Sequence, residues 1–419
     1  MNKIEKAYAL AKEQYAALGV DTDAALRKLA TVKISLHCWQ GDDVRGFESG
    51  DGLTDGGILA TGNYPGRART ADELRADADK AFSFIPGKHR FNIHAIYLEN
   101  GGKKVDRDEI EPKHFQGWID WAKQNKLGLD FNPTYFSHPL AASGLTLASP
   151  SKKVRDFWIE HGKRCRTIAA AMGRALGTPS VVNFWMPDGY KDIPADRLAP
   201  RKRMAESLDE IFSVEIPKRY ELDAFECKLF GIGSESYVVG SHEFVMGYVM
   251  KNNKILTLDS GHFHPTEQIA DKFSALSMYI DKFLLHVSRG VRWDSDHVVI
   301  WNDELRGIAE ELVRNNLLDR AHIGLDYFDA TINRIAAWTI GTRAMLKALL
   351  AALLDPIKDL RRMEKEGDFT YRLALMEEMK SMPLSDVWNY YCQTKDVPIG
   401  RAWIDEMRKY EESVQSKRV

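Results

Sequence analysis

The stretch Ile255-Leu256-Thr257-Leu258-Asp259-Ser260-Gly261-His262 contains the pattern that decides the fold. A run of strand length and bulky apolar content ends in a carboxylate, and an imidazole follows three positions later. The next segment, residues 266–276, has Ile269, Phe273 and Leu276 on one helical face. The stretch therefore predicts a strand, a loop with metal-ligand side chains, and a helix that begins at Thr266.

The same strand–helix unit recurs along the chain. Seven further apolar runs have strand length: residues 32–36, 91–98, 127–131, 181–185, 224–230, 283–287 and 322–326. Helical patterns lie between them, including residues 114–126, a long helix capped by Ser149, and residues 208–214 capped by Ser207. The alternation favours an α/β fold, a (β/α)8 TIM barrel, with an open doubly wound sheet as the alternative.

The pattern changes after Asp326. Residues 327–419 are helical in character, with helices expected at 332–354, 369–380 and 398–416. We therefore divide the chain into a barrel with an N-terminal helix, residues 1–330, and a helical C-terminal extension, residues 331–419, which packs on the barrel or on a neighbouring subunit. Residues 344–354 are apolar enough that we expect them to be buried.

Composition excludes several classes of protein. The 419 residues include 58 Lys+Arg and 60 Asp+Glu, a formal charge of −2, so no basic excess is available to neutralise nucleic-acid phosphates. Four scattered cysteines indicate reduced thiols in a cytoplasmic protein. The N-terminus has no signal-peptide pattern, and no apolar run is long enough to span a membrane.

Ligand-type side chains gather where the later predicted strands end. They are Glu226, Asp259, His262, His286, Asp294, Asp296 and Asp326. In a parallel barrel these ends meet at one face, and two like charges ~4 Å apart cost roughly 4 kcal/mol at an effective dielectric near 20. Any one of the aspartates could instead cap a helix, but seven such residues together predict a divalent-metal site.

The ligands divide into two sets. One set is His262, Asp294 and Asp296 with Asp259. The other is Glu226, Asp259, His286 and Asp326, so that Asp259 can bridge. Mostly oxygen ligands with one imidazole each favour Mn²⁺, Mg²⁺ or Co²⁺ over a thiolate zinc site.

Other side chains are expected around these ligands. Lys228 shares a strand face with Glu226, where it can form a salt bridge or donate to a substrate oxygen. His94, Trp185 and Trp39 are expected walls of the pocket, although each could serve packing alone. The glycine-rich residues 50–66 are predicted to form a long loop on the same face.

Four blocks of sequence resemble the L-rhamnose isomerase family. They are residues 34–43 (ISLHCWQGDD), 228–237 (KLFGIGSESY), 258–267 (LDSGHFHPTE) and 288–297 (SRGVRWDSDH). The resemblance implies a TIM barrel, a cytoplasmic homotetramer, and reversible conversion of L-rhamnose to L-rhamnulose. It also implies one catalytic Mn²⁺ on the His262 set and a second, structural divalent ion on the Glu226 set.

We expect the reaction to be a metal-assisted 1,2-hydride shift rather than an enediol route. Lys228, Asp326 and His94 are the expected catalytic residues, and Lys228 is expected to hydrogen-bond O1 of the sugar. Trp39, Trp185, His94 and Lys228 are the expected substrate-binding residues. The site is rich in groups that stabilise negative charge on oxygen, which favours this mechanism.

Three alternatives remain at this point. Another metal-dependent sugar isomerase or epimerase on the same barrel would have the same kind of ligand set. A metal-dependent endonuclease or phosphoesterase would need a basic groove, which the near-neutral charge disfavours. A sugar-binding protein without catalysis gives no reason to gather several carboxylates around a lysine.

Overall fold

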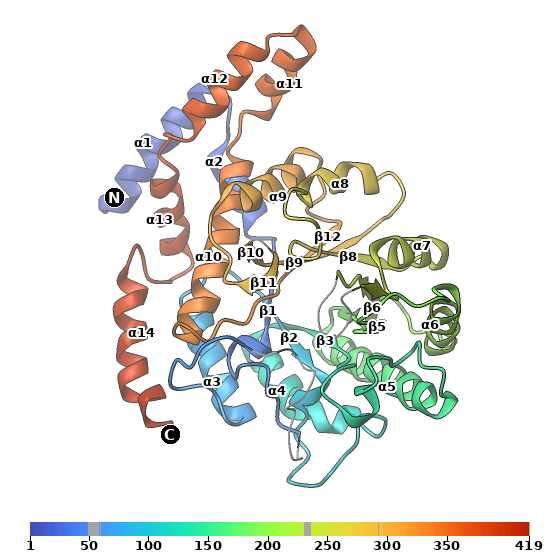
Figure 1. Ribbon diagram of the computed structural model, residues 1–419. Helices are drawn as coiled ribbons and strands as arrows, with labels where there is room; N and C mark the ends of the chain where they lie inside the picture. The colour runs from blue at the N-terminus through green and yellow to red at the C-terminus, as the bar shows by residue number, and fades with distance from the viewer. Residues whose placement is uncertain (49–57, 59, 230–235, 292, 419) are drawn as a thin grey trace.

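The predicted apolar runs form the eight strands of one closed parallel barrel (Figure 1). The computed structural model describes residues 1–48, 58, 60–229, 236–291 and 293–418, and only the backbone at 293 and 294. The barrel strands, in chain order, are β1 (Ile34–His37), β2 (Arg90–His94), β3 (Gly128–Asn132), β4 (Ser180–Phe184), β6 (Glu221–Glu226), β8 (Ile255–Asp259), β9 (Phe283–Val287) and β12 (Ala321–Leu325). The order around the barrel is β1-β12-β9-β8-β6-β4-β3-β2, so the open-sheet alternative is wrong.

Strand register places the ligand side chains near the carboxyl ends of neighbouring strands, with a stagger of two residues between β6 and β8. Asp259 pairs with His286 across β8 and β9, and Glu226 pairs with Thr257 across β6 and β8. All the strand residues from β1 to β9 of the barrel are buried. The carboxyl ends of the strands therefore form a single mouth, as the sequence predicted.

Two strands differ from the predicted runs. β2 ends at His94, and the chain continues as a 3-10 helix, Ala95–Tyr97. β6 begins at Glu221, earlier than predicted, because Glu221 and Asp223 are buried in the strand beside Arg166. A charged residue buried with a partner from a distant helix has no apolar signature in the sequence.

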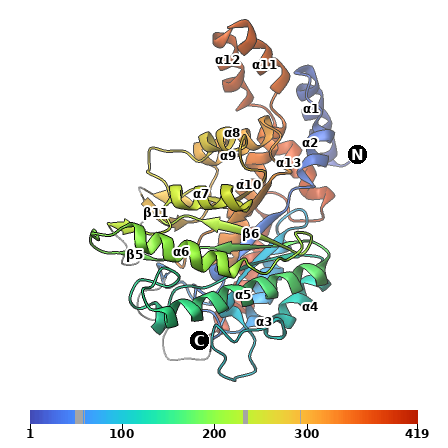
Figure 2. The same cartoon turned by 90° about the vertical axis from the view of Figure 1, so that its right-hand side faces the viewer.

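Helices surround the barrel and extend beyond it (Figures 1 and 2). They are α1 (Lys3–Ala17), α2 (Thr22–Leu29), α3 (Ala71–Phe82), α4 (Gln116–Asn125), α5 (Lys152–Leu176), α6 (Leu198–Ile211), α7 (His242–Asn252), α8 (Ala270–Leu276), α9 (Asp303–Arg314), α10 (Arg334–Leu353), α11 (Ile357–Glu366), α12 (Phe369–Met379), α13 (Leu384–Thr394) and α14 (Ala402–Ser413). Two small antiparallel hairpins, β5 (Gly189–Tyr190) with β7 (Tyr237–Val238) and β10 (Arg289–Val291) with β11 (Trp293–His297), follow barrel strands.

Three predicted helix starts are wrong. The N-cap of α5 is Ser151 rather than Ser149. Ser207 is not a cap, because it lies inside α6, where its hydroxyl donates to the Leu147 carbonyl at 2.8 Å. Helix α8 begins at Ala270 instead of Thr266. Serine and threonine hydroxyls also bond carbonyls inside helices and turns, so residue type alone does not identify a cap.

Helix α10 is the apolar helix predicted near residue 344. It is long and apolar enough to cross a membrane, but 78% of its most apolar window is buried inside the protein, as in a core helix. It lies between α9 and α3 around the barrel, and Trp338 donates its indole N–H to the His37 carbonyl of β1 at 2.9 Å. A domain boundary near residue 330 stays a prediction, and α10 packs against the barrel that precedes it.

The extension holds two helices that the sequence pattern did not reveal, α11 and α13. Helix α13 packs on the N-terminal helix, where Tyr390 stacks on Tyr8 with ring centroids 3.9 Å apart. Helices α11 and α12 project away from the barrel in both views (Figures 1 and 2).

Candidate active site

Four of the predicted ligands meet at the barrel mouth. Glu226, Asp259, His286 and Asp326 each offer a ligand atom, and these atoms all lie within 4.8 Å of one another. Nδ1 of His286 is 3.0 Å from a carboxylate oxygen of Glu226 and 3.0 Å from one of Asp326. None of the four is more than 7% exposed. The structure thus brings together one of the two predicted ligand sets.

The pKa values of this cluster are shifted by burial and by the short distances between its charged groups. Burial acts to raise the pKa of Glu226, but His286, with His262 and Asn183, more than offsets it and lowers the pKa to about 2. Burial acts to lower the pKa of His286, but Glu226 and Asp326 raise it well above its ordinary value. Burial raises the pKa of Asp326. The imidazoles beside the cluster therefore compensate only part of the charge of its carboxylates.

These residues fit a divalent cation. Within the described part of the chain, neither ring nitrogen of His286 nor Oδ1 of Asp326 has an aligned hydrogen-bond partner, although all three atoms are buried. Buried polar atoms without partners are rare unless an ion or water binds them. Three carboxylates and one imidazole are ligands typical of Mn²⁺, Mg²⁺ or Co²⁺.

The second predicted set is described only in part. His262 is 8% exposed, and its Nδ1 lies 3.3 Å from Oε1 of Glu226. Asp296 borders the same cavity, in a left-handed backbone conformation with φ of 44° at the end of the β10–β11 hairpin. The side chain of Asp294 lies outside the described residues. His262 thus lies beside Glu226, a ligand of the other predicted set.

A cavity of about 470 Å³ opens over these ligands. Its lining includes the expected substrate-binding residues Trp39, His94, Trp185 and Lys228. The ring of Trp39 stacks on His94 with centroids 4.0 Å apart. Of the loop predicted at 50–66, Ile58 and Thr61 line the cavity, and residues 50–57 and 59 lie outside the described part. The cavity is large enough for a monosaccharide and combines aromatic and polar walls.

Lys228 is the buried cation of the cavity. It is 4% exposed and donates to the Pro187 carbonyl at 3.0 Å, and its Nζ lies 5.8 Å from the Trp185 ring. Burial lowers its pKa to about 8, although Asp188 acts in the opposite direction. At neutral pH it is still an ammonium group and can donate hydrogen bonds into the cavity.

His94 is a neutral residue of the cavity wall. Burial, with a contribution from His286, lowers its pKa to about 3. Its Nε2 lies 2.9 Å from Nδ2 of Asn132, which is a donor, so Nδ1 carries the ring proton. Among the described residues Nδ1 has no hydrogen-bond partner.

The sequence reasoning missed two residues of the site. His37 ends β1, and its Nδ1 lies 3.2 Å from Oδ1 of Asp326. Asn183 in β4 donates to Glu226 at 2.5 Å and accepts from Thr257 at 2.7 Å. His37 carried the same signal as the other ligands, an imidazole at the end of an apolar run. Asn183 carried a weaker one, an amide inside an apolar run.

Comparison with known proteins gives one family. The family model described as "L-rhamnose isomerase (RhaA)" matches residues 2–418. The L-rhamnose isomerase of Rhodopirellula baltica is 63% identical over 415 residues, which are 99% of this chain and 97% of that protein. The L-rhamnose isomerase of Listeria monocytogenes is 58% identical over 416 residues, 99% of each chain.

Similarity to solved structures supports the fold. An L-ribulose 3-epimerase superposes with a TM-score of 0.50 at 14% sequence identity, over 77% of this chain and 96% of that one. At this identity the likeness shows the shared barrel alone. Sequence identity over almost the whole length is the stronger finding, and it shows that the chain belongs to the L-rhamnose isomerase family.

Proposed function

We propose that this enzyme interconverts L-rhamnose and L-rhamnulose by a 1,2-hydride shift that depends on divalent metal. The observation that carries the proposal is the cluster of Glu226, Asp259, His286 and Asp326 beneath a cavity walled by Lys228 and His94. The identity of the sugar is inferred from the names of the relatives, and the metal-dependent reaction is inferred from the cluster.

We assign the metal ligands as the sequence suggested. Glu226, Asp259, His286 and Asp326 would hold a structural ion. Asp259 and His262, with Asp294 and Asp296, would hold a catalytic Mn²⁺. Divalent ions bound here supply Lewis acidity that polarises the carbonyl and hydroxyl oxygens of the sugar.

The chain's own groups bind and orient the open-chain aldose. Lys228 donates to O1, where negative charge develops as hydride moves from C2 to C1. His94, stacked on Trp39 in the cavity wall, helps to position the sugar chain. Asp326 borders the cavity and is the candidate for moving the proton between O2 and O1. Trp39 and Trp185 cover the apolar faces of the sugar and exclude water.

Two assays test the proposal. Protein stripped with a chelator should not convert L-rhamnose to ketose, and Mn²⁺ should restore the conversion. In deuterated water, a hydride shift leaves C1 and C2 free of solvent deuterium. Rapid deuterium uptake at C1 or C2 would replace the hydride shift by an enediol, and uptake at C3 would indicate an epimerase.

We also propose a cytoplasmic homotetramer. Helix α12 has no buried residue in the described structure, and it exposes Phe369, Tyr371 and Leu373, each 57–58% accessible. An apolar arm that projects from the fold is suited to contact a second copy of the chain. Light scattering of the purified enzyme should give four times the mass of 47.6 kDa, and Tyr371→Asp should reduce the assembled fraction.

A further inference from the structure

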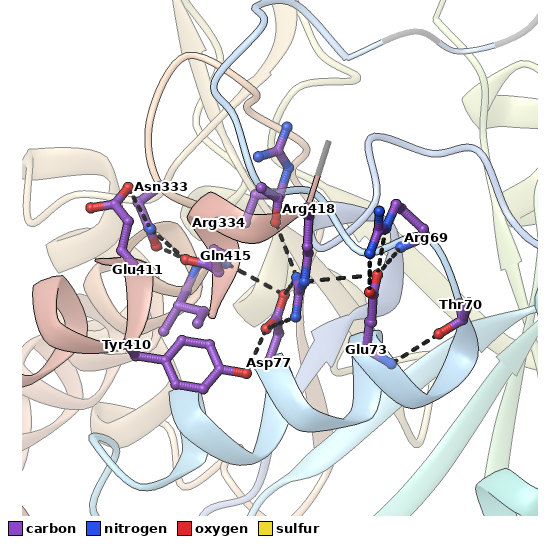
Figure 3. A network of polar contacts seen from close by, with 12 residues as sticks. Arg69, Thr70, Glu73, Asp77, Asn333, Arg334, Tyr410, Glu411, Gln415 and Arg418 are labelled. Carbon is purple, nitrogen blue, oxygen red and sulfur yellow. Dashed lines mark hydrogen bonds and ion pairs between the residues drawn. The ribbon is translucent and has the colours of Figure 1, made fainter. Parts of the chain in front are cut away.

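The segment Gln415–Lys417 and the following Arg418, here the 415–418 segment, are fixed beside helix α3 (Figure 3). The side chain of Arg418 is 4% exposed, and its guanidinium contacts both carboxylate oxygens of Asp77, which is fully buried. The same guanidinium donates to the Gly66 carbonyl at 3.0 Å. An arginine that bridges a buried carboxylate and a loop carbonyl fixes both in place.

The backbone conformation of Gly66 allows this close contact. Its φ is +83°, and a Cβ atom added there would come within 2.7 Å of Cβ of Gln415. The chain at residue 66 therefore lies directly against the 415–418 segment, at a distance that only glycine allows.

Gln415 makes the second attachment. It is 2% exposed and accepts a hydrogen bond from Nδ2 of Asn333 at 2.8 Å. Oδ1 of the same asparagine caps α10 by accepting from the backbone of Ile335 and Ala336. Figure 3 shows Gln415 between Asn333 and Asp77. The segment thus ties the start of α10 to α3.

Both attachment points are the outer ends of segments that form the cavity wall. Residues 61–66 and 328–334, here called the pocket rim, are joined by backbone hydrogen bonds from Tyr64 to Ala330 at 2.8 Å and from Ala330 to Thr61 at 3.1 Å. Four rim residues line the cavity: Thr61, Phe328, Asp329 and Thr331. Gly66 and Asn333 lie a few residues beyond them in the chain.

We infer that Arg418 and Gln415 are positioning residues that hold the pocket rim in the form that binds the aldose, an inference that rests on the proposed function. Neither residue is among the described residues that line the cavity, so neither contacts the sugar or the metal ligands. The rim forms part of the cavity wall, whereas the metal cluster lies at the ends of the strands. Loss of the attachment should weaken sugar binding and spare metal binding and chemistry.

The experiment compares Arg418→Ala with Lys417→Ala, a neighbouring exposed residue as matched control. In Arg418→Ala we expect the KM for L-rhamnose to rise roughly tenfold, because binding must then order the rim. We expect kcat within about twofold of wild type and an unchanged Kd for Mn²⁺. Lys417→Ala should match wild type in all three. A proportional fall in kcat and metal affinity, or an unchanged KM, would overturn the inference.

Hydrogen exchange provides a readout that does not depend on activity. Peptides covering 61–66 and 328–334 should exchange faster in Arg418→Ala, while strand β8 is unchanged. Faster rim exchange in a protein that does not convert L-rhamnose would reject the proposed function and keep the positioning role. Full activity with unchanged rim exchange would keep the proposed function and reject the positioning role.

Gln415→Ala is a milder variant for the case that Arg418→Ala does not fold. It removes the Asn333 contact and leaves the ion pair of Arg418 with Asp77. We expect a smaller rise in KM, with faster exchange at 328–334 than at 61–66. Equal exchange in the two halves of the rim, or no change in KM, would count against the inference.

Discussion

The two ends of the barrel hold buried carboxylates in opposite ways. At the amino-terminal end, Asp130 accepts two hydrogen bonds of 2.8 Å from Arg90, and Asp223 pairs with both Arg166 and Lys254. At the mouth, no arginine or lysine pairs with Glu226 or Asp326 among the described contacts: imidazole rings lie beside both, and the Asn183 amide donates to Glu226.

This difference distinguishes buried carboxylates that stabilise the fold from buried carboxylates that are available to bind a cation. A buried carboxylate bound by a guanidinium is neutralised within the chain, in every state of the enzyme. A cluster whose neighbours are neutral or partly charged histidines gains its compensation from a bound cation. The amino-terminal end is therefore complete as folded, and the mouth is completed by its ligand.

Removing one mouth carboxylate should have the largest effect on activity. We expect Asp259→Asn to lower kcat/KM roughly 10⁴-fold, since metal stabilisation of the developing charge is worth about 5 kcal/mol. Manganese content after dialysis and ketose formation would both be measured. A variant that turns over normally without bound metal would remove the mouth from the mechanism.

The matched change at the opposite end should affect stability. Arg90→Leu leaves Asp130 buried without its cation, which costs about 3–5 kcal/mol in the free energy of unfolding. Urea unfolding should show the same loss with and without chelator, whereas chelation alone destabilises the wild type. Lys88→Leu, at an exposed position nearby, should change the free energy by less than about 0.5 kcal/mol. A chelator-dependent loss in Arg90→Leu would break the distinction between the two ends.

Two lysines, one at each end of the barrel, sharpen the comparison: Lys228 is 4% exposed, and the side chain of Lys254 is 18% exposed. Lys228→Met should lower kcat roughly 10²–10³-fold, as when a donor to a developing oxyanion is removed, with metal content unchanged. Lys254→Met removes one of the two cationic partners of Asp223 and should lower the urea midpoint while kcat per folded enzyme stays near that of wild type. Comparable kcat values for the two variants would contradict the role of Lys228.

Asn183 should tune metal affinity. It orients Glu226, and its own orientation depends on Thr257. Removing a group that holds a ligand in place costs roughly 10–100-fold in metal affinity, which we expect for Asn183→Ala by calorimetric titration with Mn²⁺. Thr257→Val should lose less, and an equal or larger loss there would contradict this order.

The smallest expected effect is the loss of stability of the folded protein at low pH. The pKa of Asp130 is below its ordinary value of 3.8, because Arg90 and the hydrogen bonds of Ser35 and Val181 more than offset burial. The unfolded chain therefore takes up a proton first as pH falls. Asp130 therefore contributes its full stabilisation at pH values above its pKa in the unfolded chain. The contribution is lost as the pH falls through its pKa in the folded protein. The stability gap between wild type and Asp130→Asn should narrow below about pH 4, and a constant gap would contradict the sign.

Some residues of the site could be placed from the sequence and others could not, for physical reasons. Glu226, Asp259, His286 and Asp326 were predictable because barrel topology requires strand ends to meet, whatever the loops do. Asp294 and Asp296 lie in a hairpin after β9, where direction depends on loop geometry that no periodic pattern encodes. His37 carried the same signal as the strand-end ligands, an imidazole that directly follows the predicted run 32–36, and closure of the barrel places its strand beside β12.

Caps and charged strand starts show the same limit. Ser149 and Ser207 have the residue type of a helix cap, yet Ser207 instead bonds a carbonyl from another segment. The start of β6 at Glu221 was invisible because its charged residues are paired with side chains remote in sequence.

The sequence by itself determined the number and order of the strand–helix units, the side on which the ligands lie, and the apolar burial of α10. These follow from short-range periodicity, which depends only on neighbouring residues. Tertiary structure decided which carboxylates receive an arginine and which are left for a cation, and it brought the 415–418 segment against the pocket rim. Such pairings join residues far apart in the chain, so they exist only once the barrel has closed.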